Sequence, residues 1–457
     1  MSDAPTRLQF ERAWLPSGWA RGVEVSVDAN GDIVDVTRVA RIDPALRAGG
    51  CVLPGMPNLH SHAFQRAMAG LAEHAAQADD SFWTWRETMY RFAGALEPDG
   101  VQAIAAQLHV DLLRHGYTGL CEFQYLHHRP DGSPYARAAA MSEALVAAAS
   151  ESGIGLTLLP ALYVTGGLDG RALASRQRRF HHAVDAFVAL VATLRGGESP
   201  QLAVGIALHS LRAVPPEAMR ELLEDAVAEH GPIHVHIAEQ VAEVEDCRRA
   251  RGARPVEWLL DNAEVDPRWC LVHATHVTRG ELRGIAKSGA VAGLCPTTEA
   301  NLGDGLFPLR RFLELGGAFG IGSDSHVGVS PLEELRWLEY GQRLASLHRN
   351  IACSAREPSV GTTLFRDALV GGAQASGRRV GAIAAGHRAD LVVVDDTLPA
   401  FAGKPDERLL DVLVFAGNDN PVRDVMVGGA WLVRDGRHRD QERIARRYAD
   451  AMSRLAV

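Results

Sequence analysis

Lysine is almost absent from this sequence of 457 residues, in which Lys287 and Lys404 are the only two. Nearly all positive charge is therefore arginine, and the 56 acidic residues outnumber the 47 lysines and arginines. The formal net charge is −9, and no cluster of lysines and arginines stands out. Nucleic acids and anionic membrane surfaces attract dense positive charge. We therefore expect neither of them as a partner.

Cysteine is scarce and unpaired, and long apolar runs are missing. The six cysteines form no C-x-x-C pair, which favours buried free thiols in a reducing compartment. No apolar run reaches the ~18 residues of a membrane-spanning helix. The N-terminal stretch "MSDAPTRLQFERAW" contains acids and lacks the apolar centre of a signal peptide. These absences predict a cytoplasmic protein. The cysteines are Cys51, Cys121, Cys247, Cys270, Cys295 and Cys353.

The overall composition is that of a globular protein, with 47% apolar and 23% charged residues. The chain is too long for one ordinary compact domain. It suits either one large barrel with additions or two to three domains.

Both ends of the chain have the pattern of short strands and turns. Residues 1–53 include "LQFERAWLP" and the hairpin signal "DANGDI". Residues 381–457 include the apolar run "RADLVVVDD" and a hairpin signal around Gly428 and Gly429. We therefore expect the two termini to build one small β-sandwich domain together.

Residues 54–380 alternate between short apolar runs and helical stretches such as "VQAIAAQLHVDLLRHG", which has helical spacing and a terminal glycine. Eight alternating strands and helices predict an α/β fold, a (β/α)8 TIM-type barrel with its chemistry at the carboxyl ends of the strands. The eight runs are "CVLPGMPNLHSH", "GLCEFQYL", "GLTLLPALYV", "AVGIALHSL", "IHVHIAE", "CLVHATHV", "AVAGLCPTT" and "AFGIGSDS".

Histidines and carboxylates gather at the ends of the first, fifth, sixth and eighth predicted strands. Residues i and i+2 of a strand share a face, so the H-x-H pair of the first strand can bind one ion. Imidazoles with one carboxylate suit Zn²⁺ or Fe²⁺. In chain order the residues are His60, His62, His234, His236, Glu239, His273, His276, Asp324 and His326.

A histidine at a strand end is most often only a satisfied polar residue. For His234 and His276 we keep that structural interpretation. His326 is left open between a wall of the site and a loop. Four strand ends of suitable type in the right order nevertheless favour a metal site.

These motifs resemble the amidohydrolase superfamily over nearly the whole chain. The resemblance rests on H-x-H in the first strand, "HIAE" in the fifth, "HATH" in the sixth, "GSDS" in the eighth and "GHRADLVVVD" near the C-terminal end. It implies that the metal ligands are His60, His62, His236 and Asp324, and that Glu239 and His273 transfer protons.

Lysine scarcity bears on the number of metal ions. Many members of the superfamily hold two metals bridged by a carboxylated lysine of the fourth strand. The fourth strand here, "AVGIALHSLR", has no lysine, and neither Lys287 nor Lys404 lies at a strand end. We therefore expect one divalent metal ion, Zn²⁺ with Fe²⁺ as the alternative, which is the pattern of the deaminase branch.

The expected chemistry follows from these residue types. A metal ion lowers the pKa of bound water toward neutrality. Asp324 can bind the metal and accept the proton of the water, and His273 can polarise the hydroxide or the developing tetrahedral centre. Glu239 can carry a proton to the leaving nitrogen, which departs as ammonia.

Several stretches resemble the family of deiminases that hydrolyse N-formimidoyl-L-glutamate to N-formyl-L-glutamate and ammonia in histidine degradation. They are "HSHAFQRAMAGLAE", "SFWTWRETMYRF", "CEFQYLHH" and "ALHSLRAVP". Arg86 and Arg212 suit the two carboxylates of this small acidic amidine. Tyr125 is a hydroxyl donor, Gln65 lies near the metal histidines, and His209 ends the fourth strand.

Other interpretations remain open. Arg86 can be a surface arginine of a helix, and Arg212 can belong to an ordinary loop ion pair. Trp83, Trp85 and Tyr90 could instead stack on a base, which would make the protein a guanine or related purine or pyrimidine aminohydrolase. A barrel scaffold without metal or activity is a third possibility. From the resemblance we also expect a homodimer.

Overall fold

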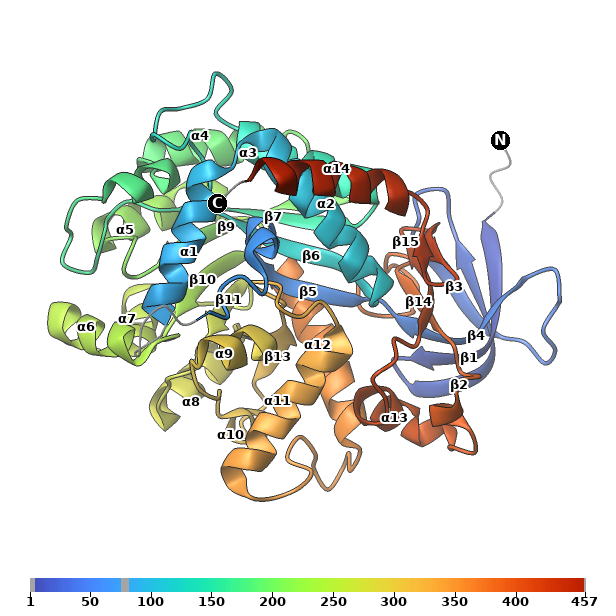
Figure 1. Ribbon diagram of the computed structural model, residues 1–457. Coiled ribbons are helices and arrows are strands. Elements are labelled where there is room, and N and C mark those ends of the chain that lie inside the picture. Colours follow the sequence, from blue (N-terminus) through green and yellow to red (C-terminus); the bar gives the residue numbers. More distant parts are fainter. Residues whose placement is uncertain (1–4, 75–81, 456–457) are drawn as a thin grey trace.

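The computed structural model describes residues 5–74 and 82–455, apart from the side chains of Phe82 and Trp83. Eight parallel strands form a barrel surrounded by helices, and a second sheet from both termini lies beside it (Figure 1). The predicted (β/α)8 barrel with a β-sandwich domain is confirmed. No described helix is both long and apolar enough to cross a membrane.

The barrel strands coincide with the apolar runs of the sequence, and nearly every residue in them is buried. The eight strands are β5 (Met56–Ser61), β6 (Tyr117–Gln124), β7 (Gly155–Leu162), β9 (Ile206–Ser210), β10 (Ile233–Ile237), β11 (Trp269–His273), β12 (Val291–Leu294) and β13 (Ala318–Ile321), and the short β8 (Leu202–Val204) pairs with β7.

The barrel closes where its first and last strands meet. A parallel bridge joins Ser61 to Asp324. The amide of His62 donates to the carbonyl of Asp324 over 3.1 Å, and the amide of Asp324 donates to the carbonyl of His60 over 3.0 Å. Closure therefore brings residues more than 260 positions apart in the sequence to the same point.

Helices cover the outside of the barrel (Figure 1). α2 begins at Pro98, three residues before the stretch quoted from the sequence. Gly116 follows its end with φ of 97°, where the sequence predicted a terminal glycine. The helices of the barrel region are α1 (Phe82–Ala95), α2 (Pro98–Arg114), α3 (Ala140–Ser152), α4 (Val184–Arg195), α5 (Pro216–Glu224), α6 (Val241–Arg251), α7 (Pro255–Asn262), α8 (Arg279–Ser288), α9 (Pro296–Leu302), α10 (Leu309–Glu314), α11 (Pro331–Ser346) and α12 (Val360–Ser376). The 3₁₀ helices there are η1 (Ala63–Met68), η2 (Ser175–Phe180) and η3 (Ala226–Ala228).

The second sheet has the order β17-β16-β15-β14-β4-β1-β2-β3, so strands of the two termini pair where β14 meets β4. The sheet folds over itself, because the amide of Ile33 donates to the carbonyl of His387 over 2.7 Å. Phe10, Val25 and Leu391 pack in its core. Its strands are β1 (Thr6–Leu15), β2 (Gly18–Val27), β3 (Ile33–Arg38), β4 (Arg47–Pro54), β14 (Leu391–Val394), β15 (Val422–Val427), β16 (Ala430–Arg434) and β17 (Arg437–His438).

The C-terminal segment also contains helices that its strand-like pattern did not predict. They are α13 (Leu409–Phe415), α14 (Gln441–Arg454), η4 (Pro399–Phe401) and η5 (Asp406–Arg408). α14 lies across the barrel beside α2 and α3 (Figure 1). Arg447 donates to Glu151 of α3 over 2.7 Å, and Arg443 pairs with the same carboxylate. The helix was missed because Ile444 is its one fully buried residue.

The six cysteines are free thiols, as expected, and five of them are buried while Cys353 is half-buried.

We predict that Gly371→Ala destabilises the barrel. α12 packs so closely on β13 that a Cβ at position 371 would lie 1.9 Å from the carbonyl oxygen of Phe319. Such overpacking costs about 1–3 kcal/mol, and calorimetry should show a lower Tm. Gly280→Ala in α8 is the control, since the nearest atom to its Cβ, Oγ1 of Thr278, is 3.7 Å away. Equal Tm values for the two variants would contradict this packing.

Candidate metal centre and substrate pocket

Three buried histidines direct their Nε2 atoms at one point. His60 and His62 come from the end of β5, and His236 comes from β10. The Nε2 atoms of His60 and His62 are 3.2 Å apart, those of His62 and His236 are 3.2 Å apart, and those of His236 and His60 are 3.0 Å apart. The H-x-H register on one strand face accounts for the first pair.

Backbone carbonyls of neighbouring strands fix two of these rings. Nδ1 of His62 donates to the carbonyl of Phe123 over 2.9 Å, and Nδ1 of His236 donates to the carbonyl of His209 over 2.9 Å. Their Nε2 atoms therefore carry lone pairs, which repel each other unless a cation lies between them. Histidines that bind a metal ion commonly donate their other ring nitrogen to a carbonyl or carboxylate in this way.

Asp324 completes the group from the opposite side of the barrel closure. Its Oδ1 lies 3.5 Å from Nε2 of both His60 and His62. Ligand atoms of a tetrahedral site with Zn–N bonds of about 2.0–2.1 Å lie about 3.3 Å apart. The observed spacings of 3.0–3.5 Å and the His3Asp donor set therefore fit one divalent metal ion.

Burial keeps the three imidazoles in the form that a metal requires. It lowers the pKa of His60 and His236 well below the ordinary value, and the neighbouring histidines lower it further. The pKa of His62 is lowered by burial as well. All three rings are therefore neutral at pH 7, and no proton has to leave before a cation binds.

Two groups that contain His60 could hold an ion, one with His62 and Asp324 and one with His236 and His273. A further group without His60 is chemically less suited. His273, Cys295 and Glu299 offer ligand atoms within 4.8 Å of one another. Burial raises the pKa of the Cys295 thiol well above its ordinary value, so the thiol keeps its proton. The Glu299 carboxylate already accepts hydrogen bonds from the Cys295 amide at 2.9 Å and from Nδ1 of His273 at 3.3 Å. The His3Asp group is therefore the better candidate for a metal ion.

His273 lies beside the metal group among carboxylates. Its Nε2 is 3.9 Å from Oε1 of Glu239 and 3.9 Å from Oδ2 of Asp324. Burial opposes its charge, but Glu239, Glu299 and Asp324 together raise the pKa of His273 to about 10. The ring is therefore a proton donor at neutral pH.

Glu239 follows β10, in the turn after His236. The Glu243 carboxylate of α6 fixes this turn by accepting the amides of Ala238 and Glu239, both over 3.1 Å. Burial raises the pKa of Glu239 to about 7, with Asp324 adding to the effect and His273 opposing it. A carboxyl group with this pKa can both give and take a proton near pH 7.

The backbone is strained where these side chains leave the strands. Left-handed φ values occur at the non-glycine residues Ala238 (54°), His273 (69°), Ala274 (47°), Asp324 (48°) and His326 (63°). Such conformations cost about 1–3 kcal/mol each and cluster at functional sites. In this barrel they re-aim side chains at the carboxyl ends of three strands.

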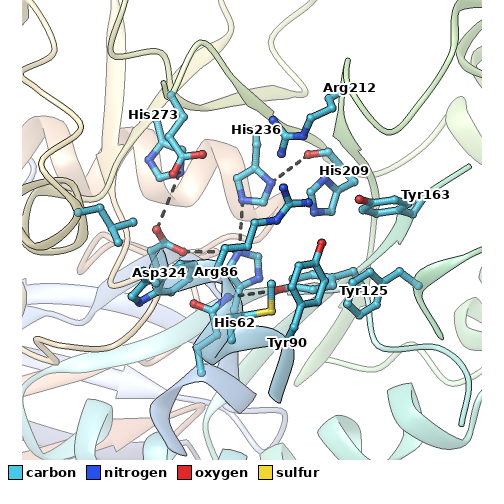
Figure 2. A pocket seen from close by; sticks show the side chains of 16 residues that line it. His62, Arg86, Tyr90, Tyr125, Tyr163, His209, Arg212, His236, His273 and Asp324 are labelled. Carbon is cyan, nitrogen blue, oxygen red and sulfur yellow. Dashed lines mark hydrogen bonds and ion pairs between the residues drawn. The ribbon is translucent and has the colours of Figure 1, made fainter. Parts of the chain in front are cut away.

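A pocket of about 600 Å³ opens over the His3Asp group. The structure brings every predicted substrate residue to its wall, namely Gln65, Arg86, Tyr125, His209 and Arg212. Glu239 lines the same pocket. So do His62, His236, His273 and Asp324 (Figure 2).

The polar substrate residues form two groups. Nε2 of Gln65 donates to the hydroxyl oxygen of Tyr125 over 3.0 Å, while the buried Oε1 of Gln65 has no hydrogen-bond partner within the described residues. Arg86 and Arg212 extend toward His209 (Figure 2). The pKa of His209 is lowered well below its ordinary value by burial and then by these two guanidinium groups. Nε of Arg212 is buried and also lacks a partner among the described residues.

Sequence reasoning missed several residues around this pocket. Tyr163 follows β7 and packs on His209 with ring centroids 4.6 Å apart. Its stretch "ALYV" ends a predicted strand, which was the available signal. Glu299 lies inside α9, the helix that follows β12. The search for polar residues at strand ends therefore did not include it. The remaining unpredicted lining residues are Met89, Phe180 and Leu302.

The three histidines that were left aside lie outside the pocket lining. His234 Nε2 donates to the carbonyl of Ala375, near the end of α12, over 2.8 Å, so this nitrogen is already bonded to the backbone. His326 contacts the hydroxyl groups of Ser61 and Ser323 at 3.0 Å and 2.9 Å, behind the metal group. His276 holds the loop after β11, since its carbonyl accepts from Arg254 over 2.5 Å.

Comparison with known proteins gives consistent similarities. Residues 51–432 match the family model described as the amidohydrolase family. The formimidoylglutamate deiminase of Pseudomonas aeruginosa is 52% identical over 446 residues, which cover 97% of this chain and 98% of that protein. A 5-methylthioadenosine/S-adenosylhomocysteine deaminase of Natronomonas pharaonis is 28% identical and covers 92% of this chain and 90% of its own.

A solved structure is similar along the whole chain as well. The crystal structure of an amidohydrolase from Brucella melitensis superposes with a TM-score of 0.92 at 43% sequence identity, covering 99% of this chain and 100% of that one.

We predict that His236→Ala abolishes stoichiometric metal binding, because it removes one of the three converging Nε2 atoms. His234→Ala is the control on the same strand, since His234 bonds to Ala375 instead. Metal analysis of purified protein should find one equivalent in wild type and in His234→Ala, and well under 0.1 equivalent in His236→Ala. A full equivalent in His236→Ala would show that the ion lies elsewhere.

Proposed function

The chain belongs to the amidohydrolase family, and we propose that it hydrolyses N-formimidoyl-L-glutamate to N-formyl-L-glutamate and ammonia, a reaction of histidine degradation. The observation that carries this proposal is the meeting of a His3Asp group, two proton carriers and two arginines in one pocket. The full-length similarity to a formimidoylglutamate deiminase supports the same substrate.

The proposed cofactor is one divalent metal ion, Zn²⁺ ahead of Fe²⁺, held by His60, His62, His236 and Asp324. When bound, such an ion supplies a Lewis acid that lowers the pKa of water and so makes a nucleophile available at neutral pH. No lysine lies on β9 to bridge a second ion.

The residues of the chain then handle the protons. Asp324 accepts the proton of the attacking water, and the water oxygen forms a bond to the formimidoyl carbon. His273, which carries a proton at neutral pH, stabilises the negative charge on that oxygen. Glu239 delivers one proton to the imino nitrogen as the water oxygen adds to the carbon. The hydroxyl group of the adduct then returns its own proton to Glu239, and the nitrogen takes up the proton that Asp324 accepted from the water. The C–N bond breaks, ammonia leaves, and the carbon becomes a formyl group.

The substrate is held at its two carboxylates and its amidine head. Arg86 and Arg212 bind the carboxylates, because a guanidinium group matches a carboxylate in a bidentate fork. Since Tyr125 accepts from Gln65, its own hydroxyl proton remains free to donate to the substrate. Gln65 contributes its unpartnered Oε1 to an N–H of the formimidoyl group.

The ring-deaminase alternative has less support. Trp83 lies outside the described side chains, and Trp85 and Tyr90 do line the pocket. However, the guanidinium group of Arg176 lies 4.3 Å from the centroid of the Tyr90 ring, and Phe180 stacks on that ring at 6.0 Å. A base would have to displace these contacts. The metal-free scaffold has no support. A scaffold protein would be expected to lack some of the metal ligands, and this chain has all four.

The remaining parts of the proposal concern assembly and location. We propose that the protein is a cytoplasmic homodimer. Its ligand is a small acidic amidine substrate, and it contacts neither nucleic acid nor membrane.

The experiment that tests this function is ammonia release from N-formimidoyl-L-glutamate by metal-loaded protein, with guanine and cytosine as parallel substrates. We expect release from the formimidoyl compound alone. Arg212→Met and Arg86→Met should each lower kcat/KM by about 10- to 150-fold, because each loses a charged hydrogen bond of about 1.5–3 kcal/mol. Arg279→Met, in the exposed first turn of α8, is the matched control. Ammonia from a base, with none from the formimidoyl compound, would refute the proposal.

A further inference from the structure

Tyr163 lines the part of the substrate pocket that is remote from the proton carriers. It lies on the opposite side of the pocket from His273 and Asp324 (Figure 2). Its ring packs on His209 with centroids 4.6 Å apart, and the His209 ring is 5.3 Å from that of the metal-group residue His236. Tyr163 therefore faces the end of a bound molecule that is far from the reacting carbon.

The hydroxyl group of Tyr163 is oriented by Gln177. Oε1 of Gln177 accepts a hydrogen bond from the amide of Ala174 over 2.9 Å, so the other end of this side chain is its amino group. Nε2 of Gln177 donates to the hydroxyl oxygen of Tyr163 over 2.8 Å. Since the oxygen is the acceptor in this bond, the hydroxyl proton is directed away from Gln177 and is available to an acceptor in the pocket.

Backbone hydrogen bonds hold Tyr163 beside Arg212. The amides of Val164 and Thr165 both donate to the carbonyl of Ala213, over 2.8 Å and 3.0 Å. The Thr165 hydroxyl group donates to the carbonyl of Arg212 over 3.3 Å. The loop after β7 and the loop after β9 are therefore tied together next to the residues whose two side chains line the pocket.

Tyr163 and Arg212 both offer a hydrogen-bond donor to a ligand. Nε of Arg212 is buried and has no partner among the described residues, and the proton of Tyr163 is turned away from Gln177. A buried donor that stays unpaired is unfavourable, so a ligand that supplies an acceptor gains affinity here. A carboxylate suits the pair, because its two oxygens accept one hydrogen bond from each donor.

The ring of Tyr163 is held in place before a ligand binds. Tyr163 is only 2% exposed, and its ring also contacts Phe180 with centroids 5.6 Å apart. Together with His209 and Gln177, this contact leaves the side chain little freedom to lose. A hydrogen bond from Tyr163 therefore costs little ordering on binding.

We propose that Tyr163, oriented by Gln177, determines substrate specificity by donating a hydrogen bond to the side-chain carboxylate of the substrate, beside the guanidinium group of Arg212. This inference rests on the deiminase function proposed above and assigns one of the two carboxylates to a neutral donor. In N-formimidoyl-L-glutamate the side-chain carboxylate is at the opposite end of the molecule from the formimidoyl carbon. That matches the position of Tyr163 across the pocket from His273 and Asp324.

A second tyrosine with the same kind of partner lies nearer the reacting end. Tyr125 accepts from Gln65 over 3.0 Å, and its ring is 5.1 Å from the ring of the metal-group residue His62. The pocket thus contains two tyrosines, each oriented by a glutamine amide. Tyr125 serves the head of the substrate, whereas Tyr163 serves the far carboxylate.

Tyr163→Phe tests the hydrogen bond, because phenylalanine keeps the ring and removes the hydroxyl group. With N-formimidoyl-L-glutamate we expect kcat/KM to fall about 10-fold or more, mainly through a higher KM, since the contact is made before and during the reaction. With N-formimidoylglycine, which has no side-chain carboxylate, kcat/KM should change less than about 2-fold. Equal losses with both substrates, or no loss with the glutamate compound, would overturn the proposal.

Tyr135→Phe is the matched control. The Tyr135 hydroxyl group donates to Glu97 over 2.5 Å, and neither residue lines the pocket. This variant loses the same atom from the same residue type, so kcat/KM should remain at the wild-type value with both substrates. A fall of the same size as in Tyr163→Phe would contradict a specific role for Tyr163.

Gln177→Leu tests whether Gln177 acts through Tyr163. The readout is the ratio of kcat/KM for N-formimidoyl-L-glutamate to kcat/KM for N-formimidoylglycine, which a general loss of structure leaves unchanged. We expect this ratio to fall in Gln177→Leu, and to be the same in the double variant with Tyr163→Phe as in Tyr163→Phe alone. An unchanged ratio in Gln177→Leu, or a further fall in the double variant, would contradict the pairing.

Calorimetric binding of N-formyl-L-glutamate separates this inference from the deiminase function, because the compound has both carboxylates and its binding requires no turnover. Wild-type protein should bind it, and Tyr163→Phe should raise Kd about 10-fold or more. Binding by wild type without ammonia release from the formimidoyl compound would refute the deiminase function and support the role of Tyr163. No binding by wild type, or equal Kd values for the two proteins, would overturn that role.

Discussion

The convergence of three neutral imidazole nitrogens is the constraint on which the rest of the site depends. Three Nε2 atoms within 3.2 Å of one another repel unless a cation joins them. Their positions require the H-x-H register of β5, carbonyl acceptors on β6 and β9, and the closure of β13 on β5. An ion bound at this point would therefore stabilise the barrel closure, and the closure would in turn favour binding of the ion.

The electrostatic environment gives the side chains around this point different protonation states. Burial lowers the pKa of the three converging histidines, so their rings are neutral. The carboxylates around His273 raise its pKa, so that ring stays charged. Glu239 lies between these extremes, with a pKa near 7. One small volume thus contains ligands that stay neutral, a donor that stays protonated and a carrier that can change state. That combination is what hydrolysis of an amidine needs.

The sequence predicted the parts of the site that lie at strand ends, because strand periodicity and barrel topology translate directly into position. His60, His62 and His236 are examples. It could not predict Glu299, which reaches His273 from inside a helix, since helix residues have no rule that ties them to the barrel mouth. α14 was missed for a different reason, as it lies on the barrel with few buried apolar residues. Tertiary contacts, rather than local pattern, decide both cases.

The most direct measurement of the central claim is X-ray absorption at the zinc edge of metal-loaded wild-type protein. The account predicts one zinc surrounded by nitrogen and oxygen donors at about 2.0–2.1 Å, with outer-shell scattering from three imidazoles. A sulfur neighbour at about 2.3 Å would place the ion at His273, Cys295 and Glu299 instead. A second metal at about 3.5–4 Å would contradict the single-ion centre.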